Sequence, residues 1–134
     1  MGLFGFELDL EKQKDNLPEI KKAVDIYKKI RSIIFNGKYY RLRSPFETNQ
    51  CAWEMVDKNR KEFCVFIGQK NYEPNPGLTV LKLRGLEENL KYKNQATGEI
   101  YGGDELMYYG LKAEFSAEDS STLFWYFVAE EQNT

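Results

Sequence analysis

Near its start, over residues 4–10, the chain alternates between apolar residues and residues that are polar or glycine. The apolar members of this pattern are Phe4, Phe6, Leu8 and Leu10, and the residues between them are Gly5, Glu7 and Asp9. Because successive side chains of a strand point to opposite faces, this period of two predicts a half-buried strand over residues 3–10.

The period changes at Asn16. Asn16 and Glu19 have the spacing of a capping box, Pro18 suits a first helical turn, and Asn36-Gly37 supplies a stop. Between these ends, apolar residues recur at helical spacing, at Ile20, Ala23, Val24, Ile26, Tyr27, Ile30, Ile33 and Ile34. The pattern predicts one long amphipathic α-helix over residues 16–36.

After Gly37 the apolar pattern returns to a period of two and keeps it. The segments predicted as strands are 38–43, 51–57, 62–69, 78–85, 90–94, 99–103, 105–110 and 121–130. Turn residues connect them, in segments such as "SPFETN", "DKNRKE" and "NYEPNPG". Short strands at this spacing predict a mainly β fold, an antiparallel β-sandwich of Greek-key type with about eight strands, preceded by the helix.

Composition removes several classes of function. The net charge of −2 provides no basic field, so neither nucleic acid nor an anionic membrane is an expected partner. The chain contains no histidine, which excludes serine-type triads, Cys–His pairs and most zinc sites. No apolar run has transmembrane length and no glycine-rich phosphate loop is present. We therefore expect no metal and no cofactor.

Two cysteines lie on neighbouring predicted strands. If residues 55–56 pair near Phe63, Cys51 faces residue 67 or 68 instead of Cys64. A disulfide between them is therefore not expected. We predict two buried free thiols, as is usual for a protein of a reducing compartment such as the cytoplasm.

The segment "YGGDELMYYGL" contains adjacent carboxylates, Asp104 and Glu105. Neighbouring residues of a strand point to opposite faces, so these two groups cannot act on one sugar from the same side. If they lie in the turn before the strand, Asp104 is better placed to cap backbone amides after Gly102-Gly103. We expect a structural role for both.

Glu7 and Asp9 form a better geometric pair, because residues two apart share a strand face at about 6–7 Å. That separation is near the range of paired carboxylates in glycosidases. A lone strand and helix provide no pocket for them, however, and a polar strand face is the commoner explanation. No residue of the chain is therefore assigned a catalytic role.

Exposed aromatic residues would provide a platform for stacking sugars. The candidates are Tyr39, Tyr40, Trp53, Tyr108, Tyr109 and Trp125. In a sandwich most such side chains fill the core or an interface, and we favour that interpretation. The basic residues Lys58, Arg60 and Lys61 are interpreted as a solvated loop.

The order of four longer motifs adds a resemblance. The motifs are "FGFELDL", "YKKIRSIIFNGKYYRLRSPFETNQCAW", "EPNPGLTVLKLRGL" and "YGGDELMYYGL". Together they cover nearly the whole chain, and they resemble the C-terminal end of bacterial α-galactosidases of glycoside hydrolase family 36. The departures from that family's pattern are small, at Phe6, Thr48 and Gly77.

The resemblance implies a fragment of a larger enzyme. Residues 1–37 look like a remnant of the last βα unit of a (β/α)8 barrel, and residues 38–134 look like the C-terminal β-sandwich domain that follows it. One βα unit cannot close a barrel, so the strand over residues 3–10 would be frayed, added to a sandwich edge or paired with a second molecule.

The resemblance also implies where the chemistry lies. The family's retaining mechanism uses an aspartate nucleophile in a K-x-D-x-N motif and an aspartate acid/base, and this sequence contains neither motif. The chain alone is not expected to hydrolyse terminal α-galactosides such as melibiose and raffinose, although the parent enzyme would. The expected partner is the catalytic barrel domain, with homo-oligomerisation possible; the alternative function is a carbohydrate-binding module.

Overall fold

The computed structural model describes residues 11–12, 14–71, 79–115 and 121–131. The strand predicted over residues 3–10 lies outside the described residues and stays a prediction. The chain divides into two compact units, Met1–Arg31 and Ser32–Thr134.

The long helix is confirmed. A short 3₁₀ helix, Lys14–Asn16, leads into α1, Leu17–Asn36, so the predicted helix over residues 16–36 has its start and end placed within one residue. The periodic apolar stripe and the asparagine before its first residue are local signals, and they fix both ends of the element.

Gly37 ends α1 for a steric reason. Its backbone N–H donates to the Ile33 carbonyl oxygen at 2.8 Å. A Cβ at this position would lie 2.4 Å from the Ile33 oxygen and 2.7 Å from the Val56 oxygen. No side chain fits there, so glycine is required where the helix passes into the first strand.

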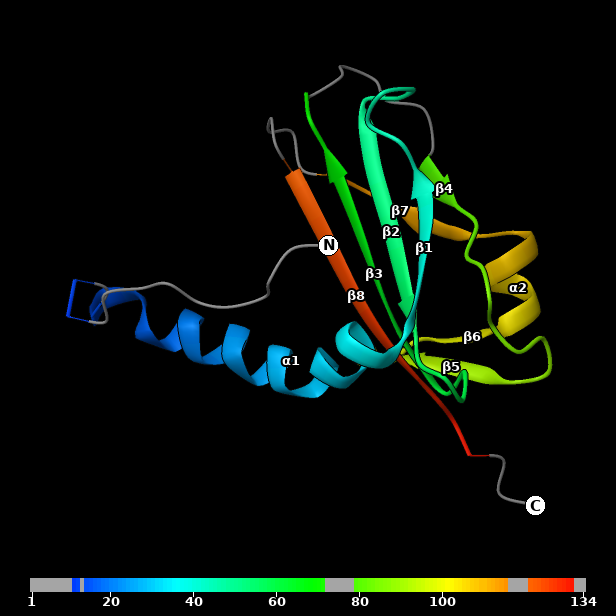
Figure 1. Ribbon diagram of the computed structural model, residues 1–134, viewed down its shortest axis with the longest axis horizontal. Coiled ribbons are helices and arrows are strands. Elements are labelled where there is room, and N and C mark those ends of the chain that lie inside the picture. The colour runs from blue at the N-terminus through cyan, green and yellow to red at the C-terminus, as the bar shows by residue number, and fades with distance from the viewer. Residues whose placement is uncertain (1–10, 13, 72–78, 116–120, 132–134) are drawn as a thin grey trace. The chain divides into compact units, whose positions relative to one another are not determined.

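The second unit contains two antiparallel sheets joined by a small helix (Figure 1). The larger sheet has the strand order β1-β2-β3-β8-β5-β6, and the smaller sheet pairs β4 with β7. The strands are β1 Lys38–Arg43, β2 Gln50–Val56, β3 Glu62–Gln69, β4 Thr79–Leu81, β5 Lys91–Asn94, β6 Ile100–Gly102, β7 Leu111–Ala113 and β8 Ser121–Ala129, and the helix is α2, Gly103–Tyr108. The last strand is inserted between β3 and β5, which brings the end of the chain into the middle of the sheet.

The predicted fold class is confirmed: the described residues form a mainly β, antiparallel structure with eight strands and one long helix. The strands predicted over residues 38–43 and 62–69 match β1 and β3. The second layer is smaller than a full sandwich sheet, because the strand predicted over residues 78–85 is paired only over Thr79–Leu81.

One predicted strand is wrong. Residues 105–110 belong mostly to α2, which begins at Gly103 and buries Leu106 completely. A pattern of only six residues fits a helical turn as well as a short strand. The backbone contact between Gly103 and Leu90, whose carbonyl accepts the Gly103 N–H at 2.9 Å, sets the direction of the chain here.

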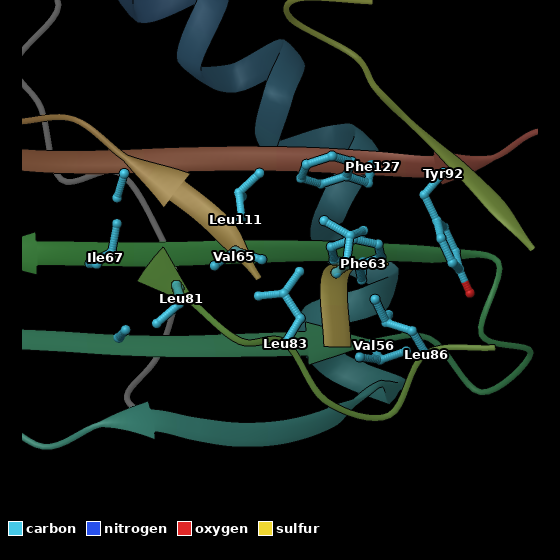
Figure 2. Packing of buried hydrophobic residues seen from close by; sticks show 13 residues of the cluster. Val56, Phe63, Val65, Ile67, Leu81, Leu83, Leu86, Tyr92, Leu111 and Phe127 are labelled. Carbon is cyan, nitrogen blue, oxygen red and sulfur yellow. The ribbon is translucent and has the colours of Figure 1, made fainter. Parts of the chain in front are cut away.

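The core lies between the two layers (Figure 2). Phe63 stacks on Phe127 with ring centroids 4.7 Å apart, and Tyr92 meets Phe63 edge-on at 5.2 Å. The buried residues that share this core are Ala52, Val56, Phe63, Val65, Ile67, Leu81, Leu83, Leu86, Tyr92, Leu106, Leu111, Ala113 and Phe127. Burial of this apolar set holds the two layers together.

A polar contact also joins the layers. The Arg43 guanidinium at the end of β1 donates to Gln50 Oε1 at 2.9 Å and to the carbonyl oxygen of Val80 in β4 at 2.8 Å. It therefore connects the edge of the large sheet to the small one through charge-assisted hydrogen bonds.

Candidate functional surfaces

Asp104 and Glu105 lie in the first turn of α2, and both are exposed. Asp104 Oδ1 accepts the N–H of Glu105 at 2.8 Å, and Glu105 Oε2 accepts the N–H of Gly102 at 3.3 Å. The premise that they lie on a strand is wrong. The expected hydrogen bond from a backbone amide after Gly102-Gly103 to Asp104 is present, and the carboxylate of Glu105 adds a second one from the amide of Gly102. Carboxylates at this position satisfy free amides and complement the helix dipole.

Glu7 and Asp9 lie outside the described residues, so their geometry stays a prediction. The basic turn after β2 is described and is exposed as expected at Lys58, Arg60 and Lys61. Arg60 has a positive φ of 56°. Its guanidinium also forms an ion pair with Glu87 Oε1 at 2.9 Å, which connects the turn to the loop before β5.

The candidate aromatic residues do not form one platform. Tyr40 and Trp125 lie on the face of the large sheet that carries the core, in one row of neighbours with Glu54 and Val65. Tyr39 and Trp53 lie on the opposite face, because each directly precedes a member of that row in its strand and successive side chains of a strand point to opposite faces. Tyr108 and Tyr109 are exposed at the end of α2.

The face of the large sheet opposite the core is also apolar and aromatic; we call it the outer sheet face. Strand register places its members in two rows, Tyr39–Met55–Cys64–Tyr126 and Trp53–Phe66–Phe124. Trp53 stacks on Phe66 at 5.4 Å, and Phe66 contacts Phe124 at 4.7 Å. Ile33 and Ile34 of the last turn of α1 pack against this face.

The outer sheet face was missed by the sequence reasoning, although a signal for it exists. Residues 63–67 and 123–129 are continuous apolar runs, where a half-exposed strand would alternate. Such runs are typical of strands that are covered on both faces. The central strands of this sheet are therefore built for apolar contact on the outer sheet face as well as in the core.

A buried carboxyl group was also missed. Glu54 of β2 is fully buried on the core face, and its Oε1 accepts the Arg84 N–H at 2.8 Å. Its Oε2 has no hydrogen-bond partner among the described residues. Burial raises the pKa of Glu54 to about 8, although the Arg84 amide and charge act in the other direction. The carboxyl group is therefore mainly protonated at neutral pH.

The two cysteines follow the predicted register. Val56 lies opposite Phe63, Cys51 lies opposite Gly68, and both thiols are free. The prediction that both are buried is wrong for Cys51, which is half-buried near the start of β2. Burial, with a smaller effect of Glu54, raises the pKa of Cys64 to about 12, so this thiol is protonated at physiological pH.

The described part of the chain lacks two features that would suggest other functions, a membrane-spanning helix and a metal site. None of its helices is both long and apolar enough to cross a membrane. Within the same residues, no three His, Cys, Asp or Glu side chains gather in a way that could hold a metal ion.

Comparison with known proteins gives consistent matches. The family model "Glycosyl hydrolase family 36 C-terminal domain" matches residues 50–127. Alpha-galactosidase AgaA of Geobacillus stearothermophilus is 38% identical over 132 residues, which cover 98% of this chain and 18% of AgaA. Alpha-galactosidase Mel36A of Lactobacillus acidophilus is 40% identical over 129 residues, which cover 96% of this chain and 18% of Mel36A. This chain therefore spans less than a fifth of the length of these curated relatives.

Solved structures agree with the sequence matches. A variant of AgaA in complex with 1-deoxygalactonojirimycin superimposes with a TM-score of 0.87 at 37% identity, over 95% of this chain and 18% of that one. The α-galactosidase of Lactobacillus brevis gives a TM-score of 0.87 at 29% identity, over 97% of this chain and 19% of that one.

Proposed function

This chain belongs to the glycosyl hydrolase family 36 C-terminal domain family, and we propose that it serves as a non-catalytic accessory domain of an α-galactosidase. The parent enzyme would hydrolyse terminal α-galactosides such as melibiose and raffinose. Similarity to α-galactosidases over nearly the whole chain carries this proposal. More than four-fifths of each relative lies outside the matched segment, which leaves room for a catalytic domain.

We propose that the functional boundary lies at Gly37. Residues 1–37 would complete the last βα unit of the catalytic barrel, and residues 38–134 would form the accessory domain. The change from helix to strand supports this division, since α1 ends at Asn36 and β1 begins at Lys38.

We propose that the outer sheet face is the surface through which this domain stabilises the catalytic barrel. Tyr39, on one edge of that face, is 44% exposed, and Phe35 in the adjoining end of α1 is 64% exposed. The last turn of α1 already packs on this face through Ile33, so the chain segment that leads to the barrel reaches the surface directly. Burial of exposed aromatic surface by another domain contributes strongly to the affinity between the two domains.

The test uses the full-length α-galactosidase that carries this domain. Deletion of residues 38–134 should abolish soluble, active enzyme, measured as nitrophenyl α-galactoside turnover in the soluble fraction. Phe66→Glu should speed thermal inactivation of the parent by roughly tenfold or more, because a charge in a buried aromatic contact is costly. Tyr109→Glu is the matched control, since Tyr109 is 81% exposed on the other layer.

Two results would contradict these proposals, the first the accessory role and the second docking through the outer sheet face. One is a deleted enzyme that stays soluble and fully active. The other is a Phe66→Glu parent that inactivates no faster than the Tyr109→Glu control. If Phe66→Glu destabilises the isolated chain as much as it destabilises the parent, the role of the outer sheet face in docking is wrong, while the accessory role stands.

The isolated 134-residue chain should not turn over the nitrophenyl α-galactoside. Turnover by purified chain that is lost in Asp104→Asn or in Glu7→Gln would overturn the proposal. Light scattering after size exclusion would show whether the chain forms a homo-oligomer. We also propose a cytoplasmic location, which the two free cysteines support.

A further inference from the structure

A hollow of about 420 Å³ opens at one side of the core, where β6 and β8 of the large sheet face β7 of the small sheet. Its volume is within the range of small-molecule sites in proteins. We call it the β7 hollow. The residues that line it are Glu99, Tyr101, Lys112, Glu114, Leu123 and Trp125.

The apolar part of the β7 hollow is a continuation of the core. Leu123 lies opposite Ile67 and Trp125 lies opposite Val65, so both side chains are on the core face of β8. Both remain partly exposed. The Tyr101 ring meets Phe127 edge-on at 6.1 Å, which fixes its orientation. These contacts hold the aromatic surface in place before any ligand arrives, so little ordering is needed on binding.

The polar part of the hollow carries both donors and acceptors. The Tyr101 hydroxyl donates to Glu99 Oε2 at 2.6 Å. Lys112 of β7 points away from the core, as the buried positions on either side of it show, and Glu114 follows the same alternation. Within the described residues, the side chains of Lys112 and Glu114 form no hydrogen bond or ion pair. Both are therefore available to a ligand.

The charges of the lining sum to −1 and select against anionic ligands most strongly. A phosphate would meet the two carboxylates of Glu99 and Glu114, and a cation would meet the ammonium of Lys112. A neutral ligand with many hydroxyl groups avoids both penalties, because carboxylates accept its O–H groups and the ammonium donates to its oxygens. An apolar C–H face on the same ligand suits the indole of Trp125.

These observations fit one chemical class of ligand. We propose that the β7 hollow is a saccharide-binding site for a hexose or a short oligosaccharide, with Trp125 as its apolar floor and Glu99, Lys112 and Glu114 as its polar rim. This function goes beyond structural support of the catalytic domain, and it does not depend on the outer sheet face, which lies on the other side of the large sheet.

The test uses the 134-residue chain carrying Trp53→Phe. The chain has two tryptophans, and Trp53 lies on the outer sheet face, so its removal leaves Trp125 as the only indole reporter. Raffinose and maltotriose are titrated to about 50 mM while tryptophan fluorescence is recorded. We expect a saturable change with a dissociation constant of roughly millimolar or below for at least one of them. Absence of a saturable change with both sugars would overturn the proposal.

Variants of the polar rim residues test whether the sugar binds in the β7 hollow. Glu114→Gln and Lys112→Met alter exposed side chains and should leave folding intact, but each should weaken binding by about three- to tenfold through a lost hydrogen bond. Tyr109→Ala is the matched control, because it removes an exposed aromatic residue outside the hollow, and it should bind as the parent does. Unchanged affinity in both rim variants would mean that the sugar binds elsewhere.

Trp125→Ala, measured by backbone amide chemical shifts in ¹⁵N-labelled chain, provides a second check. It should lose the sugar-induced shifts at Tyr101 and Lys112 that the parent chain shows. If this variant fails to fold, the two rim variants still decide the outcome.

Discussion

Replacement of Glu54 by glutamine should remove a strong pH dependence from the stability of this domain. The carboxyl group is fully buried in the core face of β2, and one of its oxygens accepts the backbone N–H of Arg84 at 2.8 Å. Tyr40 lies opposite Glu54 on the neighbouring strand, and the Arg84 guanidinium lies 5.5 Å from the centre of its ring. Cys64 precedes Val65, the residue of β3 opposite Glu54, and lies on the other face of the sheet. Glutamine keeps the shape and an acceptor oxygen but does not titrate in this range.

The magnitude follows from the shift in pKa. The pKa of Glu54 rises from 4.5 to about 8 on burial, so between these values the folded protein holds one more proton than the unfolded chain. Stability therefore falls as pH rises, because unfolding releases that proton. The stabilisation is fully present below about pH 4.5 and is lost by about pH 8. The total is about 5 kcal/mol, of which about 4 kcal/mol lies between pH 5 and pH 9.

The assay is urea unfolding of the 134-residue chain at several pH values, followed by tryptophan fluorescence. The free energy of unfolding is measured for the parent and for Glu54→Gln, and the difference is plotted against pH, which cancels groups that titrate alike in both. Burial raises the pKa of Cys64 to about 12 in the folded protein, so this thiol titrates only in the unfolded chain near the upper end of the window, and that contribution is common to both proteins. A difference that changes by less than about 1 kcal/mol between pH 5 and pH 9 would refute the assignment of a buried, protonated Glu54.

Three further predictions follow from packing and burial. Gly103→Ala should destabilise the domain by about 2 kcal/mol or more in urea unfolding, because its Cβ would lie 1.9 Å from the Glu87 carbonyl oxygen. Phe63→Ala should cost about 3–5 kcal/mol in the same assay, since this ring is fully buried and contacts two others. With iodoacetamide at neutral pH, mass spectrometry should show Cys51 alkylated well before Cys64, because Cys64 is buried and its pKa is raised.

Each of these has a matched control in the same chain. Gly102→Ala should be much milder than Gly103→Ala, since its Cβ would closely approach only the Asp104 side chain. Phe46→Ala should have almost no effect, because Phe46 is 93% exposed. Equal costs within either pair, or alkylation of Cys64 at the rate of Cys51 in folded protein, would contradict the packing described here.

The elements with strong local signals were predictable from the sequence. α1 has a helical apolar stripe, a capping residue before its first turn and Gly37 after its last, and all of these act within a few residues. β1, β2 and β3 have turn residues between them, and the register that separates Cys51 from Cys64 follows from the length of one hairpin turn. The motif order alone indicated the family to which the chain belongs.

The rest depended on contacts between residues far apart in the chain. Residues 105–110 carry too short a pattern to choose between strand and helix, and burial of Leu106 against the core decided it. Strand pairing also placed the aromatic residues that were candidates for sugar stacking on different faces. Pairing of β8 with β3 put Trp125 on the core face, whereas pairing of β2 with β3 put Trp53 beside Phe66 on the outer sheet face. Which face a side chain occupies is set by nonlocal strand pairing. The sequence by itself therefore determined the helix, the hairpins and the family, whereas only the tertiary structure decided that Glu54 is buried, that the outer sheet face is aromatic and that the β7 hollow exists.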